Sequence, residues 1–379
     1  MTADPGFGLY LHWPYCAQKC PYCDFNSFAR TPEDATVWAD AYVQEIERHA
    51  ALVGPQTLRS IYFGGGTPSL MEAETVQAVI DAAQKVWRFA NDIEITLEAN
   101  PSSVEQGRFW DFKAAGVNRL SLGVQALKED DLRRLGRLHS IDDALQALDV
   151  SRSTFDRVSF DLIYARQNQT IEDWSAELTQ ALSFDPGHLS LYQLTIEPGT
   201  AFHDRFHRGN LKGLPDEDVS ADMFELTQDM TAAAGLPAYE ISNHARPGLQ
   251  SRHNLIYWSG GSWAGIGPGA HGRLWVDGQR VGTESFLDPA HWLKQVAASG
   301  GTRVSETLSQ EDIANEYIMM GLRQVDGISQ QRLHTILGSE LCIDPDLVDM
   351  GFLDVSNDHI RTTAKGRPLL NQIIEKLLV

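Results

Sequence analysis

The fold is decided by one stretch near the N-terminus, Tyr10-Leu-His-Trp-Pro-Tyr-Cys16-Ala-Gln-Lys-Cys20-Pro-Tyr-Cys23. Its cysteines have the spacing of one helix face, but Pro21 would remove a backbone donor from that helix and disfavours helical backbone at Cys20. A loop can instead bring the three sulfurs together. Because three of the four cysteines lie in this short stretch, the pattern indicates a metal site and not a disulfide framework.

The kind of metal site follows from counting ligands. Three cysteines with His12 could complete a tetrahedral zinc site. An iron–sulfur cubane takes four ligands, and the fourth cysteine, Cys342, is far away in the sequence. We expect Cys342 to be a small buried apolar residue. Three thiolates on a cubane would leave one iron without a protein ligand, and such an iron is suited to holding a small molecule.

The quoted stretch resembles the Cys-x3-Cys-x2-Cys signature of the radical S-adenosylmethionine (radical SAM) superfamily. Its flanks resemble the branch that contains coproporphyrinogen dehydrogenases and their heme-chaperone relatives. The resemblance implies a [4Fe-4S] cluster on Cys16, Cys20 and Cys23, with S-adenosylmethionine (SAM) chelating the open iron. It also implies a partial (β/α)6 barrel.

Segment periodicity independently predicts an α/β fold. Strand patterns at 8–12, 60–63, 93–97, 119–124, 158–163 and 189–194 alternate with helical patterns at 38–52, 75–86, 104–115 and 171–182. Alternation alone fits either a barrel or a Rossmann sheet, and the resemblance favours the incomplete barrel. We expect three domains: the radical SAM core (1–240), a short β extension (241–290) and a helical, winged-helix-like C-terminal domain (291–379). Short strands are expected at 239–241, 255–258 and 273–276.

Candidate SAM-binding residues follow the strands in family order. The resemblance assigns the methionine amino group to Gly65, Gly66 and Thr67, and the ribose hydroxyls to Glu98. It implies that Gln125 and Asp161 complete the nucleoside site, that Arg137 meets the ligand carboxylate, and that Tyr10 and Tyr22 contact SAM beside the cluster loop. Most of these positions lie at the carboxyl ends of strands, where β/α barrels gather binding groups.

Two functions remain open within the branch: a chaperone that binds heme and passes it on, and an oxygen-independent coproporphyrinogen III dehydrogenase that decarboxylates propionates through a radical. The dehydrogenases carry a further cysteine where this chain has Phe25, and a long extension before the cluster. The stretch His253-Asn-Leu-Ile-Tyr-Trp258 resembles a heme-chaperone motif, which implies His253 as a heme ligand with Tyr257 and Trp258 as packing groups. His244 and His271 are reserve ligands. We therefore favour the heme chaperone.

The amino-acid composition limits the kinds of partner that this chain can bind. With 31 Lys and Arg against 51 Asp and Glu, the net charge is −20, which disfavours nucleic acid. No apolar run is long enough to cross a membrane, and the N-terminus lacks the order of a signal peptide. We expect a cytoplasmic protein whose partners are heme, heme-accepting proteins and, if the cluster is redox-active, an electron donor.

Overall fold

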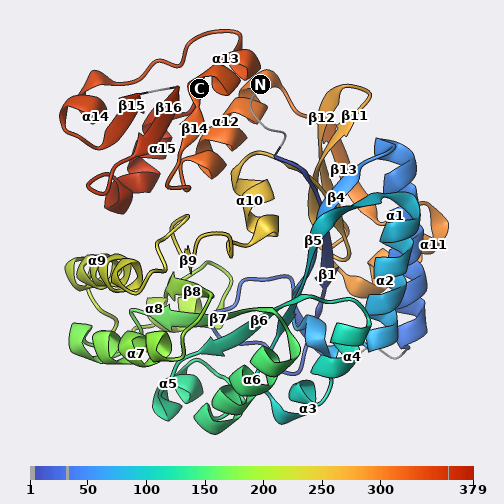
Figure 1. Cartoon of the computed structure of the whole chain (residues 1–379), viewed down its shortest axis with the longest axis horizontal. Helices are drawn as coiled ribbons and strands as arrows, with labels where there is room; N and C mark the ends of the chain where they lie inside the picture. Colours follow the sequence, from blue (N-terminus) through green and yellow to red (C-terminus); the bar gives the residue numbers. More distant parts are fainter. Residues whose placement is uncertain (1–4, 31–33, 357) are drawn as a thin grey trace.

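The computed structural model describes residues 5–30, 34–356 and 358–379. Six parallel strands form an open, curved sheet (Figure 1): β1 (Phe7–Trp13), β4 (Thr57–Gly65), β5 (Arg88–Ala99), β6 (Arg119–Gln125), β7 (Arg157–Tyr164) and β8 (His188–Gln193). They follow one another in space in chain order, and β8 does not pair with β1. The expected six strands and the incomplete barrel are therefore confirmed.

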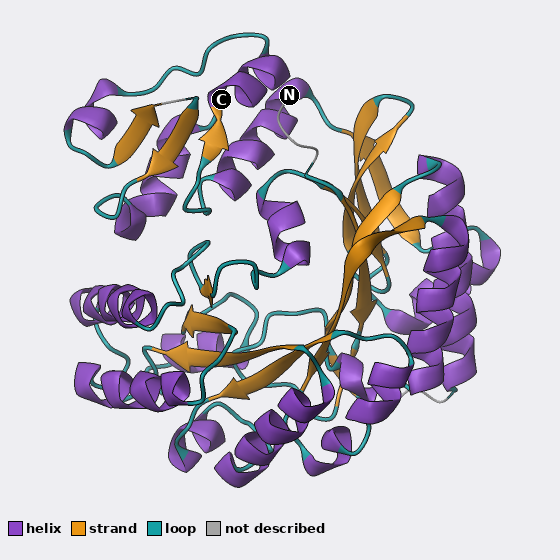
Figure 2. Ribbon diagram, in the orientation of Figure 1, coloured by secondary structure: helices purple, strands orange, loops and turns teal. Residues whose placement is uncertain are grey.

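Helices follow these strands along the chain, and most of them cover the outer side of the sheet (Figure 2). They are α1 (Ala35–Val53), α2 (Ala73–Val86), α3 (Ser103–Gln106), α4 (Phe109–Ala114), α5 (Glu129–Arg134), α6 (Ile141–Thr154), α7 (Ile171–Ser183), α8 (Ala201–His207) and α9 (Glu217–Ala233), with a 3-10 turn at Pro68–Leu70. Capping boxes start α6 at Ser140 and α7 at Thr170. The single helix expected over 104–115 is wrong, because a turn at 107–108 divides it into α3 and α4.

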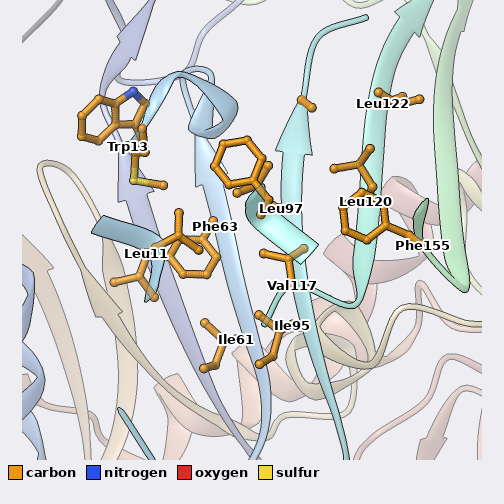
Figure 3. Close-up of a cluster of buried hydrophobic side chains, with 14 of the residues drawn as sticks. Leu11, Trp13, Ile61, Phe63, Ile95, Leu97, Val117, Leu120, Leu122 and Phe155 are labelled. Carbon is orange, nitrogen blue, oxygen red and sulfur yellow. The ribbon is translucent and has the colours of Figure 1, made fainter. Parts of the chain in front are cut away.

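Side-chain alternation gives the sheet two different faces. On one face, apolar residues of adjacent strands form a continuous core under the helices (Figure 3), among them Leu11, Ile61, Phe63, Leu97 and Leu120. Neighbouring positions point to the opposite, inner face. These inner residues are largely polar: Tyr10, Ser60, Tyr62, Glu98, Ser121, Ser159, Asp161, Ser190 and Tyr192. A polar interior of this kind suits a binding site better than a packed core.

Strands that follow β8 in the sequence extend the sheet at both of its edges. At one edge β9 (Asn243–Ala245) pairs with β8, and at the other β10 (Ser262–Ile266) runs parallel to β1. The antiparallel strands β11 (His271–Val276), β12 (Gln279–Ser285) and β13 (Thr302–Thr307) complete that edge, with α11 (Pro289–Ala298) between the last two. The strand expected at 273–276 is confirmed within β11.

The strands expected at 239–241 and 255–258 are wrong. Residues 239–241 form a bend, and 255–258 belong to the helix α10 (Arg252–Trp258), whose N-cap is Ser251. Helix α10 lies on the inner side of the sheet, next to β4 and β1 (Figure 1). Short apolar runs do not separate helix from strand, and here the capping serine decides for the helix.

The C-terminal part has its own hydrophobic core, which begins at Ala314. It contains α12 (Gln310–Gly321), α13 (Gln330–Leu337), α14 (Pro345–Asp349) and α15 (Leu370–Leu377), a 3-10 turn at Arg367–Leu369, and a small sheet of β14 (Ile328–Ser329), β15 (Leu353–Ser356) and β16 (His359–Thr362). The large sheet continues through β13 at Thr307. The domain boundaries at 240 and 290 stay predictions.

Within the described residues, no helix is both long and apolar enough to pass through a membrane.

One buried ionic group joins the strands to α10. The Glu94 carboxylate lies 3.4 Å from the Arg119 guanidinium and 3.1 Å from that of Arg157, and it accepts the backbone N–H of Arg252 at 2.8 Å. Removing one partner of a buried ion pair leaves an uncompensated charge in a region of low dielectric.

We therefore expect Glu94→Gln to destabilise the chain by about 3 kcal/mol, measured as the shift of the urea unfolding transition. The exposed Glu306 on β13 provides the control, because Glu306→Gln should change stability by less than about 0.5 kcal/mol. Equal shifts for the two variants would contradict this role of Glu94.

Candidate functional site

The three cysteines lie on a loop that follows β1 at the carboxyl end of the barrel. Cys16 is in the short strand β2 (Tyr15–Cys16), which pairs with β3 (Phe28–Ala29) and so holds the base of the loop. Cys16 is buried, whereas Cys20 and Cys23 are half-buried. The Ser27 hydroxyl interacts with both the Cys16 and the Cys23 thiols. The loop thus brings the three thiols near one another, and their binding of a cluster stays a prediction.

The surroundings make the Cys16 and Cys23 thiols costly to ionise without a bound cation. Burial raises the pKa of Cys16 and of Cys23. The Arg137 guanidinium works against this rise in the pKa of Cys16, and its Nη1 lies 3.5 Å from the Cys20 sulfur. A metal centre at this loop would supply the positive charge that three thiolates require.

The zinc alternative with His12 does not fit this arrangement. His12 Nε2 bonds the Asn26 carbonyl at 2.9 Å, and Nδ1 bonds the Tyr10 hydroxyl at 3.0 Å, so both ring nitrogens are occupied. Among the residues that the structure describes, no three His, Cys, Asp or Glu side chains surround a single ion position. A zinc ion would need them all within about 2.0–2.3 Å of itself. A cubane does not need His12, since each of the three thiolates would bind a different iron.

Cys342 is not the buried apolar residue that the sequence led us to expect. It is exposed, between α13 and α14 of the C-terminal part. The residues around Cys342 show no helical or strand periodicity of apolar side chains. The sequence therefore offers no basis for predicting whether this side chain is buried.

The glycine-rich segment after β4 brings backbone close to the cluster loop. The Gly66 and Thr67 amides donate to the carbonyls of Trp13 and Tyr15 at 2.6 and 2.8 Å. Gly65 has a φ of +109°, and a Cβ there would lie 2.7 Å from the His12 ring. Only glycine fits at this position. The segment therefore locks β4 against the loop that carries Cys16.

Glu98, at the carboxyl end of β5, is held by two donors. The Tyr62 hydroxyl donates to it at 2.7 Å and the Gly65 amide at 3.2 Å. Burial raises the pKa of Glu98 to about 7, and the nearby Asp161 adds to the rise. Glu98 is thus poised to change charge near neutral pH.

Asp161, on β7, has an incomplete set of hydrogen bonds. Burial raises its pKa to about 6, which the hydroxyls of Ser190 and Ser121 partly offset. Its Oδ1 is buried and has no hydrogen-bond partner among the described residues. Such an atom on the inner face indicates a place where a donor from a ligand would be favourable.

Arg137 points at the cysteine loop. Its Nη2 donates to the Gly123 carbonyl at 2.8 Å and to the Asn100 side-chain oxygen, and it interacts with the Tyr22 hydroxyl and the Cys20 thiol. If the Arg137 guanidinium also bound a ligand carboxylate, it would do so while bonded to these partners.

The remaining SAM candidates lie at the same end of the barrel. Gln125 ends β6 with a φ of +72°, an uncommon value outside glycine. Tyr22 packs on Phe202, with ring centroids 6.3 Å apart. Tyr10 faces Tyr62 at 6.3 Å inside the barrel. The structure brings all these candidates to the inner face or its rim, and their contacts with SAM stay predictions.

The ring nitrogens of His253 are not free to bind iron in this structure. It is 1% exposed, its Nδ1 bonds the Ser60 hydroxyl at 2.8 Å, and its Nε2 bonds the Tyr257 hydroxyl at 2.5 Å. Burial lowers the pKa of His253 to about 3, so the ring is neutral. Iron could reach it only after one of these hydrogen bonds breaks.

Tyr257 and Trp258 of the heme motif and the two reserve ligands, His244 and His271, differ in how far their side chains are exposed. Tyr257 packs on Trp263 with ring centroids 4.4 Å apart, and Trp258 is half-buried. His244 is fully buried, and burial lowers its pKa to about 4. His271, at the start of β11, is exposed.

Sequence reasoning missed two residues of this site. Asn100 follows Glu98 at the carboxyl end of β5, accepts from Arg137 and donates to the Thr67 hydroxyl at 3.1 Å. Tyr62 on β4 holds Glu98. The alternation of β4 and the Asn-Pro pair after β5 would have placed both on the inner face and its rim.

Comparison with known proteins gives two family matches. The model described as the Radical SAM superfamily matches residues 10–179, and the model described as the HemN C-terminal domain matches residues 308–369. In fold, the chain is similar to the Escherichia coli coproporphyrinogen III oxidase HemN, a radical SAM enzyme. That match has a TM-score of 0.81 at 22% identity and covers 100% of this chain and 92% of the other.

Two relatives match along the whole chain. The mitochondrial Radical S-adenosyl methionine domain-containing protein 1 of Mus musculus is 40% identical over 100% of this chain and 88% of its own length. The heme chaperone HemW of Escherichia coli (strain K12) is 37% identical over 100% of both chains. On this full-length similarity, together with the three-cysteine loop on an open β/α barrel, the chain belongs to the radical SAM superfamily and, within it, to the HemW family.

Proposed function

We propose that this protein is a heme chaperone that carries a [4Fe-4S] cluster and SAM, binds heme and delivers it to acceptor proteins. The observation that carries the proposal is the loop of three gathered thiols beside a polar barrel interior, in a chain that is similar to HemW over its whole length. Electron supply to the cluster and a cytoplasmic location are parts of the same proposal.

Cys16, Cys20 and Cys23 would hold the cluster. The fourth cysteine of the chain, Cys342, lies in the C-terminal part and would leave the fourth iron open. When bound, the cluster supplies an iron that can chelate the amino and carboxylate groups of SAM. Arg137 would stabilise negative charge at Cys20 and hold the loop against the ends of β5 and β6.

The inner face would hold the nucleoside part of SAM. The Glu98 carboxylate would accept from ribose hydroxyls, and the partnerless Asp161 Oδ1 would accept from a ligand donor. Gln125 would complete the site from β6. Because Glu98 is fixed by Tyr62 and Gly65, little side-chain entropy would be lost on binding.

Heme binding rests on the similarity to HemW. The assignment of His253 as iron ligand, with Tyr257 and Trp258 as packing groups, stays a prediction. It requires that His253 exchange its bond to Ser60 or Tyr257 for iron.

The second candidate is the oxygen-independent coproporphyrinogen III dehydrogenase. It is favoured by one observation, the likeness of fold to the porphyrin enzyme HemN over the whole chain. At 22% identity this likeness concerns the fold alone, so an assay has to decide between the two activities.

The pKa of Glu98 gives a pH dependence for SAM affinity. Ribose hydroxyls donate more strongly to a carboxylate than to a neutral acid, and Glu98 ionises around pH 7. Affinity of the cluster-loaded chain for SAM should therefore rise about tenfold between about pH 6 and pH 8, measured by calorimetry.

Glu98→Gln should flatten this profile, because the amide does not titrate. The matched variant Glu74→Gln changes an exposed residue of α2 and should keep the wild-type profile. A pH dependence that is the same in wild type and Glu98→Gln would remove Glu98 from the ribose site.

The function itself is tested by two measurements on one anaerobic preparation. Hemin is titrated into the protein and the loaded protein is mixed with apomyoglobin, while a parallel sample with reductant and SAM is assayed for decarboxylation of coproporphyrinogen III. We expect hemin binding, transfer to apomyoglobin and no decarboxylation. Decarboxylation, or a failure to bind hemin, would overturn the chaperone proposal.

A further inference from the structure

A large cavity lies outside the barrel, between the β extension and the C-terminal part. Its volume is about 1030 Å³, just above the roughly 300–1,000 Å³ usual for ligand and cofactor sites. One wall is formed by β10, β11 and β12, and the other by α12 and α13. It is separate from the cysteine loop, and none of the candidate SAM residues lines it.

Strand alternation explains which side chains face the cavity. On β11 the residues His271, Arg273 and Trp275 share one face and line the cavity, whereas Gly272 and Leu274 between them are buried on the other face. Opposite them, Ile313, Glu316, Tyr317 and Met320 recur on α12 at the spacing of one helix face. Regular elements therefore build both walls.

The walls are suited to a flat aromatic ligand. Trp263, Trp275, Tyr257 and Tyr317 bring four aromatic rings to the cavity, and Met319 and Met320 add adaptable apolar contacts. Trp275 is 51% and Met319 is 38% exposed. Large apolar side chains left open in a concave surface indicate a binding site for an apolar body.

The charged residues of the cavity suit acidic groups on that ligand. Four arginines line it: Arg273, Arg280, Arg323 and Arg332. Three of them are already engaged: Arg273 with Glu316, Arg280 with Ser262 and Gly261, and Arg332 with Gly260 and Ser259. Arg323 has no ion pair, and its guanidinium has no hydrogen bond, to any described residue. It can pair with a carboxylate.

His271 supplies the nitrogen donor that a heme iron requires. It is the only histidine among the residues lining the cavity, its side chain is 57% exposed, and the Glu284 Oε1 lies 4.0 Å from its Nδ1. His253, by contrast, is buried and hydrogen-bonded through both nitrogens. An imidazole ligand open to the cavity is therefore present without rearrangement.

We propose that this cavity is the heme site: the porphyrin lies between β11 and α12, where it displaces the Arg273–Glu316 ion pair that bridges the two walls, His271 binds the iron, and Arg323 pairs with a propionate. The inference rests on the proposed heme-chaperone function and gives that function a place in the fold. His253 then acts as a positioning residue, because its bond to the Tyr257 hydroxyl fixes a ring that lines the cavity.

The test is an anaerobic titration of the full, cluster-loaded chain with hemin, followed through the Soret band and the spin state of the iron. His271→Ala should lose the histidine-ligated spectrum and weaken binding about tenfold or more, and added imidazole should restore the spectrum. Arg323→Ala should weaken binding about tenfold with the spectrum unchanged. His359→Ala, an exposed histidine of β16 outside the cavity, should match wild type.

The results for wild type and for the histidine and arginine variants distinguish failure of this heme site from failure of the heme-chaperone function on which it rests. If wild type binds hemin and both His271→Ala and Arg323→Ala bind it unchanged, the site is elsewhere and the chaperone function stands. If His253→Ala, and not His271→Ala, loses the histidine-ligated spectrum, the inference is overturned in favour of the buried histidine. If wild type binds no hemin, both the function and the inference fall.

Discussion

The contact of the Arg137 guanidinium with the Cys20 sulfur is the interaction on which the site depends. The same side chain bonds Gly123 and Asn100, at or just beyond the carboxyl ends of β6 and β5, so it ties the cysteine loop to the barrel rim. Among the described residues, Arg137 is the cation whose contact with a cysteine sulfur is recorded, so it offsets part of the cost of ionising these thiols. Arg137 thus joins the electrostatics of the loop to the position of the loop over the polar interior.

A row of packed aromatic rings joins the barrel interior to the cavity between β11 and α12. The rings of Tyr62, His253, Tyr257 and Trp263 follow one another with centroids 5.0, 4.6 and 4.4 Å apart. The first two lie inside the barrel, and the last two line the cavity beside α12. Packed rings transmit displacement well because protein interiors are dense. Binding in the barrel and in the cavity would therefore share a common wall, formed by α10 and β10.

The sequence predicted the alternation of strands and helices well, because that information is local, whereas the choice of the open barrel over a Rossmann sheet came from the family resemblance. The six parallel strands follow from alternating apolar residues such as Ile61, Phe63 and Leu97, and the cysteine spacing with Pro21 requires a loop. The predictions that were wrong concern short segments. The apolar run at 255–258 has no period of its own, and only the Ser251 cap identifies α10. The exposure of Cys342 depends on packing that no local pattern encodes.

Long-range pairings explain what the sequence could not give for the site. The bond between Ser60 and His253 joins residues 193 positions apart, and it changes His253 from an open ligand to a buried, neutral ring. Likewise, His271 becomes a candidate only when β11 and α12 face each other. A sequence motif identifies candidate ligand residues. Whether the ring nitrogen of such a histidine is free to bind iron depends on the residues that surround it in the folded chain.

The central claim, a cubane on three thiolates with one open iron, is tested most directly by Mössbauer spectroscopy of anaerobically reconstituted protein with and without SAM. The account predicts about four irons per chain, one of which changes its signal when SAM is added. It also predicts loss of the cluster in Cys16→Ala, Cys20→Ala and Cys23→Ala, and retention in Cys342→Ala. Stoichiometric zinc, or four equivalent irons that do not respond to SAM, would contradict it.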